Sequence, residues 1–180
     1  MAVLQSLRDL FIAAAPRRAE VIPAPPTIYE IRLLTKKQLR EVAKLNLRCF
    51  ARGENYSRHT FTYLLDNPET LSYRAVTPSG EMTGFIFAMM NPDGAAHITT
   101  IGVAPEHRRR ELASRLLAHL EDSLRAKEVS TVVLEVRISN QIAYDFYKRR
   151  GYASVQLLKK YYSNGEDGYL MTKSAGSRRA

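Results

Sequence analysis

The chain has 180 residues, of which 45% are hydrophobic and 25% are charged. This size and balance predict one folded domain with a substantial core and exclude a disordered or fibrous chain. The 27 Lys and Arg residues exceed the 18 Asp and Glu residues and give a formal net charge of +9. Such an excess favours an anionic partner, which could be a nucleotide, nucleic acid, the ribosome or an acidic membrane.

Cysteine and histidine content argues against disulfides and structural metal. Cys49 is the single cysteine, and the four histidines do not follow a zinc-ligand spacing. We therefore expect a cytoplasmic protein without a metal site. The longest apolar run, residues 10–15, stops at Pro16 and is too short to span a membrane, so we expect no membrane partner.

Residues 1–27 are predicted to form an extension outside the folded domain. The apolar residues of the first 15 have helical spacing, which allows an amphipathic helix that packs on the domain or on a partner. Residues 16–27 are rich in proline and read as an extended linker. The domain itself is expected at 28–173, followed by a basic tail at 174–180.

The first half of the domain alternates helices and strands. We expect a strand at 28–34, a helix at 36–49 and a second helix at 57–66 that begins at Ser57, a favoured capping residue. Strands at 71–76, 82–90 and 96–103 are separated by the turn sequences TPSG and NPDG, which predicts a three-stranded meander.

The second half predicts a parallel crossover. Residues 109–127 form a long amphipathic helix, and 132–136 form a buried strand that the helix connects in parallel to the meander. A helix at 140–150 is stopped by Gly151, and strands at 152–162 and 169–173 complete the domain. This order predicts the α/β class with a mixed sheet.

The junction between strand 96–103 and helix 109–127 carries three consecutive arginines, Arg108, Arg109 and Arg110. The first turn of a helix has free N–H groups and the positive end of the helix dipole, so it can bind an anion. Three arginines alone would more often be a solvated surface. Their place between a strand and a helix favours a phosphate-binding loop.

This loop resembles the acetyl-coenzyme A motif of the GNAT acyltransferase family, Arg/Gln-x-x-Gly-x-Gly/Ala. The resemblance implies acetyl-coenzyme A as acetyl donor, with no metal, and places Glu111 where the family has glycine. A carboxylate there is expected to weaken cofactor binding without abolishing it. The implied cofactor-binding residues are Ile101, Gly102, Val103, Arg108, Arg109, Arg110, Glu111, Leu112, Ala113, Asn140, Ala143 and Tyr147.

Three further motifs resemble those of N-terminal protein acetyltransferases within the GNAT family. Residues 134–152 follow the pattern L-x-V-R-x-S-N-x-x-A-x-x-x-Y-x-x-x-G-[FY], and 160–171 follow K-Y-Y-x-x-G-E-D-x-Y-x-M. Residues 53–56, GENY, are similar to a P-E-N-Y loop. The resemblance implies the GNAT fold, a mixed and mostly antiparallel sheet of about seven strands flanked by about four helices.

The same resemblance assigns roles to four residues. Glu135 is the first choice for the base that deprotonates the attacking amine, and Tyr147 is the acid that protonates the leaving thiolate. Glu54 and His97 are second choices, either alternative bases or members of a water relay. The residues implied for the peptide slot are Glu54, Tyr56, Tyr161 and Tyr162.

Each of these residues also has an ordinary structural explanation. Glu135 could face solvent from a strand edge. Its apolar neighbours instead favour a buried strand, where an unpaired carboxylate is unfavourable and a functional role would explain its presence. Tyr147 could simply pack in the core, and Asn140 could only cap its helix. Tyr161 and Tyr162 could be ordinary strand residues.

The resulting prediction is an enzyme that transfers acetyl from acetyl-coenzyme A to the α-amine of a protein or peptide N-terminus in a ternary complex. One alternative is a GNAT enzyme that acetylates a lysine or a small-molecule amine. Another is a binding module with weakened catalysis. We expect a monomer or a weak dimer, and the basic surface leaves room for association with the ribosome.

Overall fold

Seven strands of the described chain form one sheet in the order β1-β2-β3-β4-β5-β7-β6. This computed structural model describes residues 21–50 and 55–174. The strands are β1 Glu30–Leu33, β2 Thr70–Val76, β3 Met82–Met90, β4 Ala96–Val103, β5 Thr131–Arg137, β6 Ala153–Leu158 and β7 Gly168–Ser174. The α-helices are α1 Leu39–Cys49, α2 Arg58–Asp66, α3 Leu112–Ala126 and α4 Gln141–Arg149. The predicted α/β class and mixed, mostly antiparallel sheet are confirmed.

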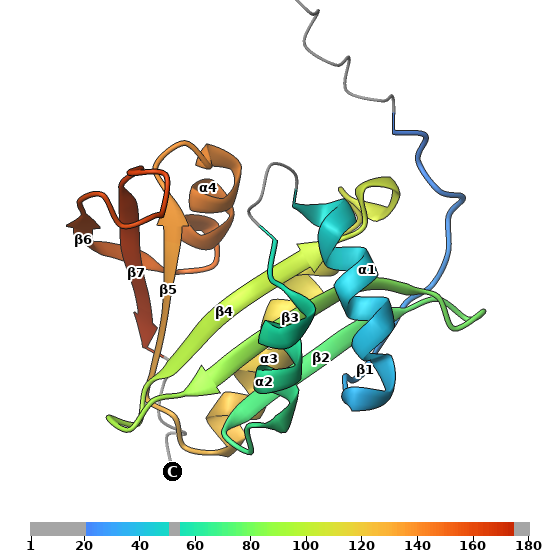
Figure 1. Cartoon of the computed structure of the whole chain (residues 1–180), viewed down its shortest axis with the longest axis horizontal. Helices are drawn as coiled ribbons and strands as arrows, with labels where there is room; N and C mark the ends of the chain where they lie inside the picture. Colours follow the sequence, from blue (N-terminus) through green and yellow to red (C-terminus); the bar gives the residue numbers. More distant parts are fainter. Residues whose placement is uncertain (1–20, 51–54, 175–180) are drawn as a thin grey trace, which may run out of the picture.

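One pair of neighbouring strands is parallel. β4 and β5 share only two residue pairs, Ala96 with Val132 and His97 with Val133. Beyond these pairs the two strands run apart, as Figure 1 shows. The other neighbouring pairs are antiparallel, including β5 with β7 and β7 with β6. The sheet therefore consists of two halves that meet along a short seam.

Apolar residues cover both faces of the sheet. On β3, Ile86 and Ala88 belong to one cluster, which includes the buried leucines of α3. Phe85 and Phe87 alternate with them and join a second cluster under α1 and α2. This alternation is what a strand buried on both faces requires. The first cluster also contains residues of β5 and β7, so it continues across the seam.

The turns and helix caps agree closely with the sequence. Gly80 and Gly94 have φ angles of 87° and 81° and close the two turns of the predicted meander. Ser57 accepts a hydrogen bond from the Thr60 N–H at the start of α2. Asn140 caps α4 in the same way, by accepting from the Ala143 N–H.

Two element boundaries were wrong. The helix predicted from residue 109 begins at Leu112, because Arg109 and Glu111 have left-handed φ angles of 60° and 58°. The strand predicted for 152–162 ends at Leu158. There the chain turns through Lys160, which has a φ of 50° and donates its N–H to Asp167.

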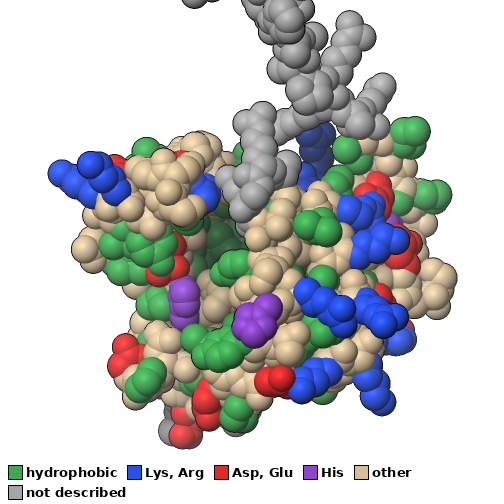
Figure 2. Space-filling view, viewed as in Figure 1, with side chains coloured by type: hydrophobic (Ala, Val, Ile, Leu, Met, Phe, Trp, Pro, Cys, Tyr) green, Lys and Arg blue, Asp and Glu red, His purple; other side chains and the backbone are tan. Residues whose placement is uncertain are grey.

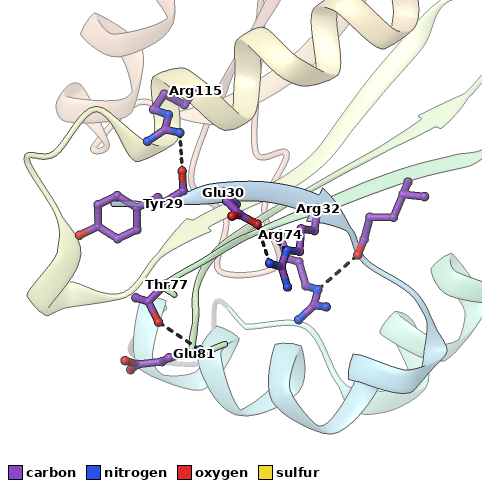
Figure 3. A network of polar contacts seen from close by, with 8 residues as sticks. Tyr29, Glu30, Arg32, Arg74, Thr77, Glu81 and Arg115 are labelled. Carbon is purple, nitrogen blue, oxygen red and sulfur yellow. Dashed lines mark hydrogen bonds and ion pairs between the residues drawn. The ribbon is translucent and has the colours of Figure 1, made fainter. Parts of the chain in front are cut away.

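The edge strand β1 is held in place by arginines from other elements. Arg115 of α3 donates to the Tyr29 carbonyl over 2.6 Å, and Arg74 of β2 donates to the Leu33 carbonyl over 3.2 Å (Figure 3). Within β1, Arg32 pairs with Glu30. These contacts fix both ends of a strand that has a neighbour on only one side.

The chain before β1 lies against the start of α3. Ala24 donates its N–H to the Glu106 carbonyl over 2.9 Å, and Arg110 donates to the Pro25 and Ala24 carbonyls. Part of the predicted linker is thus anchored. The amphipathic helix predicted for residues 1–15 lies outside the described residues. In the described chain, no helix combines the length and apolar character that a membrane span needs.

Candidate active site

The seam between β4 and β5 brings together two of the predicted catalytic residues. His97 is in the last parallel pair of β4, and Glu135 lies two residues beyond the partner of His97 on β5. The His97 Nε2 and Glu135 Oε2 atoms are 2.6 Å apart. Their side chains are 26% and 18% exposed, so the pair is largely shielded but open to solvent. Figure 2 shows a recess in the surface between the two halves of the molecule.

Strand alternation explains how Glu135 avoids the core. Leu134 and Val136 are 2% and 4% exposed and pack in the cluster under α3 and α4. Side chains of successive strand residues point to opposite faces, so Glu135 lies on the other face of β5. The carboxylate thus sits on a strand of the sheet, beside the His97 imidazole.

Three tyrosines gather around this carboxylate. Burial raises the pKa of Tyr56, and the charge of Glu135 raises it further. The same two causes raise the pKa of Tyr161, and burial is the main reason that the pKa of Tyr162 rises to about 12. The Tyr56 hydroxyl donates to the Thr99 carbonyl of β4 over 2.9 Å. These three residues of the predicted peptide slot therefore share one environment, whereas Glu54 lies outside the described residues.

Tyr147 lies on α4 and is 5% exposed. Burial strongly raises the pKa of its hydroxyl, and the neighbouring Tyr162 adds to this effect. Phe146 and Tyr152 contact its ring at centroid distances of 5.1 and 5.4 Å. The phenol therefore remains protonated at neutral pH and can donate a hydrogen bond.

The loop between β4 and α3 forms a pocket of about 180 Å³. Its lining includes six of the predicted cofactor residues: Val103, Arg108, Arg109, Glu111, Leu112 and Ala113. The N-cap residue Glu111 makes no side-chain capping hydrogen bond at the start of α3, so it leaves the N–H groups of this helix start available to a ligand. This arrangement fits a phosphate group. His107, Ser114 and Phe146 also line the pocket and were not predicted.

Two of the three loop arginines are bound to the protein itself. Arg108 donates to the Val103 and Cys49 carbonyls over 3.2 and 3.1 Å and still lines the pocket. Arg110 donates to the Tyr29 hydroxyl and to the linker carbonyls, and it is not among the lining residues. The structure does not bring Arg110 to the pocket, because its guanidinium anchors the segment before β1.

Glu111 has an ion-pair partner that the sequence did not reveal. Its Oε2 atom is 3.2 Å from an Nη atom of Arg150, the C-cap residue of α4. Loop and helix are distant in sequence, so only the fold brings these side chains together. Arg150 is the last residue of a basic run, residues 148–150, at the C-terminal end of α4.

The remaining predicted cofactor residues have clear structural roles. A Cβ atom on Gly102 would lie 2.7 Å from the ring of Phe85, so close packing alone requires glycine there. Ile101 packs at the border of the core, as does Ala143 of α4. Asn140 caps α4 through its side-chain oxygen. These contacts are compatible with cofactor binding.

One group of possible metal ligands occurs among the described residues, namely Glu81, Glu106 and His107. Glu106 forms an ion pair with Arg48, and His107 Nδ1 is 2.9 Å from the Tyr29 hydroxyl. Two of the three residues therefore have protein partners, and we assign no cation to the group.

Comparison with known proteins identifies the family. A family model described as the acetyltransferase (GNAT) family matches residues 38–152. That match spans most of the chain, from the start of the helix pair to the end of α4. The chain belongs to the GNAT acetyltransferase family.

Relatives of this GNAT acetyltransferase include enzymes that act on protein N-termini. The catalytic subunit of the N-terminal acetyltransferase A complex of Arabidopsis thaliana is 32% identical over 149 residues, which cover 80% of this chain and 77% of the relative. An N-alpha-acetyltransferase of Sulfurisphaera tokodaii is 30% identical, with 79% and 91% covered. The structure of the ribosomal-protein-S18-alanine N-acetyltransferase from Escherichia coli superposes with a TM-score of 0.75 at 26% identity, covering 85% of this chain and 99% of that one.

Proposed function

We propose that the protein transfers an acetyl group from acetyl-coenzyme A to the α-amine of a protein or peptide N-terminus. The observation that carries the proposal is the hydrogen-bonded pair of His97 and Glu135 at the seam, 2.6 Å apart and next to Tyr56, Tyr161 and Tyr162. Relatives at 30% and 32% identity bear names of N-terminal acetyltransferases, which favours this acceptor over other amines.

Glu135 accepts the proton that the amine must lose to attack. An N-terminal α-amine has a pKa of about 8, so a carboxylate, acting directly or through water, is an adequate base. His97 holds the Glu135 carboxylate in place through the 2.6 Å hydrogen bond and offers a second site for the proton. The shielded position of the pair strengthens both interactions.

Tyr147 supplies a proton at the other end of the reaction. Its hydroxyl is protonated at neutral pH, and burial raises its pKa further. Acetyl-coenzyme A supplies the acetyl group as an activated thioester. In the balanced reaction the C–N bond forms and the C–S bond breaks, while Glu135 takes a proton and Tyr147 donates one to the thiolate.

The tyrosines beside Glu135 form the proposed wall for the substrate backbone. Tyr56 is fixed by its hydrogen bond to Thr99 and by a bond from the Asn46 side chain to its own carbonyl. Tyr161 is 48% exposed and remains accessible to a peptide. An extended N-terminus between Tyr56 and Tyr161 would bring its amine toward the Glu135 carboxylate.

The test measures coenzyme A release with short peptides that differ in their first two residues. Each peptide is paired with a copy whose α-amine is blocked and whose internal lysine is free. We expect release only with free α-amines, and mass spectrometry should place the acetyl group there. Equal acetylation of the blocked peptides would show that lysine is the acceptor instead. Failure to bind or cleave acetyl-coenzyme A would indicate a binding module rather than an enzyme.

The Glu135→Gln variant tests the base. General-base catalysis contributes about 10²- to 10⁴-fold, so we expect kcat to fall by about 10²-fold or more. Affinity for coenzyme A should not change. Glu128→Gln, an exposed carboxylate beyond the end of α3, is the matched control and should keep wild-type turnover. Normal turnover by Glu135→Gln would remove Glu135 from this role.

A further inference from the structure

Arg150 stands at the rim of the pocket at the start of α3, although neither a motif nor the proposed mechanism gives it a role. One Nη atom is 3.2 Å from Glu111, and the guanidinium carbon lies 5.8 Å from the centre of the Phe146 ring. Glu111 and Phe146 both line the pocket. The guanidinium is therefore held between two lining residues, from the C-terminal end of α4.

Two of the arginines near the pocket are bound to backbone carbonyls, and a carboxylate lies at the helix start. Arg110 is bound to the linker, and both donor groups of Arg108 described above are bound to carbonyls. Glu111 adds a negative charge at the position where free N–H groups would receive a phosphate. Arg108 and Arg109 line the pocket, and Arg150 is the cation paired with the Glu111 carboxylate, so the electrostatic environment for an anionic ligand also depends on where Arg150 points.

The pair is free to rearrange. The Glu111 side chain is 79% exposed and that of Arg150 is 37% exposed, and a solvent-exposed ion pair contributes little stability. A phosphate group carries more charge than a carboxylate and accepts two parallel hydrogen bonds from a guanidinium. A phosphate in the pocket would therefore compete successfully with Glu111 for Arg150.

We propose that Arg150 binds a phosphate group of the coenzyme, and that Glu111 holds its guanidinium at the rim of the pocket until the phosphate replaces the carboxylate. The inference rests on the proposed use of acetyl-coenzyme A as donor. Glu111 is then a competitor that the phosphate must displace, so its net effect is to weaken coenzyme binding.

A purely structural role makes a different prediction. If the ion pair only joined α3 to α4, loss of either partner would disturb the pocket in the same way. In our proposal, Glu111 competes with the phosphate whereas Arg150 binds it. Loss of Glu111 and loss of Arg150 should therefore change the affinity for coenzyme A in opposite directions. The direction of the two changes therefore separates the two explanations. Arg149 shares the position at the negative end of the α4 dipole but is exposed, so it serves as the matched control for charge.

The experiment is calorimetric titration of coenzyme A into the full-length wild-type protein and the variants Arg150→Ala, Arg150→Lys, Glu111→Gln and Arg149→Ala. Since charge-assisted hydrogen bonds are strong, Arg150→Ala should weaken binding about tenfold. Arg150→Lys keeps the positive charge and should recover part of the lost affinity. It also provides a second test in case the alanine variant does not fold. Glu111→Gln should tighten binding about twofold or more, and Arg149→Ala should change it by less than about twofold.

Dephospho-coenzyme A, which lacks the 3′-phosphate, identifies the group that is bound. If the effect of Arg150→Ala disappears with this ligand, Arg150 contacts the 3′-phosphate; if it persists, Arg150 contacts the pyrophosphate. Both results support the proposal. Unchanged affinity of Arg150→Ala, or a loss of affinity in Glu111→Gln as well, would overturn it. Absence of coenzyme A binding by the wild-type protein would instead overturn the proposed function, and this inference with it.

Discussion

Glu111 occupies the N-cap position of α3 with a backbone φ of 58°. This left-handed conformation suits glycine, because a Cβ atom at positive φ approaches the backbone too closely. Glutamate is also a poor N-cap, and here its side chain makes no capping hydrogen bond. The glycine in the family motif therefore matches a requirement of this backbone, apart from any role in cofactor binding.

Glu111→Gly is expected to stabilise the folded protein. Relief of strain at positive φ outweighs the greater freedom of glycine in the unfolded chain and the loss of one exposed ion pair, leaving a gain of about 0.5–1 kcal/mol. For a chain of this size, 1 kcal/mol corresponds to about 2–4 °C in Tm, which thermal unfolding resolves. Lys127→Gly is the control, because Lys127 ends the same helix with a φ of −96° and should lose stability on the same change. A lower Tm for Glu111→Gly would contradict the argument.

Motif resemblance named candidate site residues, but it could not predict their contacts. Motif resemblance named Glu135 and His97, whereas their 2.6 Å contact depends on the parallel register of β4 and β5. That register is set by the hydrophobic pattern of the whole sheet and is not visible in either segment alone. For the same reason, neither the binding of Arg110 to the linker nor the Glu111–Arg150 pair could be foreseen.

The connection between β6 and β7 shows how an element positions side chains at the site. Glu166 accepts a hydrogen bond from the Ser139 N–H over 3.0 Å and is 2.8 Å from Arg137. The Arg137 guanidinium lies 3.8 Å from the centre of the Tyr162 ring. Since Arg137 ends β5 and Tyr162 belongs to the connection, Glu166 and Arg137 hold the proposed peptide wall against the sheet.

Local sequence explains why this connection was partly mispredicted. The segment from Tyr152 to Tyr162 contains three tyrosines and several apolar residues, including Val155, and so has strand character. The turn depends on Lys160 in a left-handed conformation and on the bond of its N–H to Asp167. Lysine carries no turn signal, and the stabilising carboxylate comes later in the chain.

Glu166→Gln is expected to destabilise the protein at neutral pH and to raise KM for peptides more than it lowers kcat. Hydrogen bonds from Ser139 and Arg137 lower the pKa of Glu166 to about 2. A carboxyl whose pKa is lowered by folding stabilises the protein above its unfolded pKa and loses this contribution as the pH falls toward 2. The difference in Tm between wild type and variant should therefore be full at neutral pH and shrink in acid.

Glu69→Gln provides the control, because Glu69 is an exposed carboxylate in the turn immediately before β2. Its Tm should follow the wild type across the same pH range. A difference between wild type and Glu166→Gln that stayed constant with pH would show that the carboxylate charge is not what holds the connection.

At the scale of the whole molecule, the sheet needs support at its seam. The two residue pairs between β4 and β5 cannot by themselves make the halves one cooperative unit. The larger apolar cluster supplies the link, because it joins the leucines of α3 to Val132 and Leu134 of β5 and to Met171 of β7. The diverging strands can therefore frame a site without dividing the domain.

Leu120→Ala tests this link, because Leu120 lies near the middle of α3 and is 0% exposed. Removing a fully buried leucine side chain should lower the free energy of unfolding by about 2–5 kcal/mol. Since one cluster serves both halves, hydrogen exchange of the slowest amides in β2 and β7 should accelerate by the same factor. Leu47→Ala, at a position 62% exposed on α1, should change stability by less than about 0.5 kcal/mol. If Leu120→Ala accelerated exchange in β2 alone, the halves would unfold separately, and the site would rest on two linked units rather than on one.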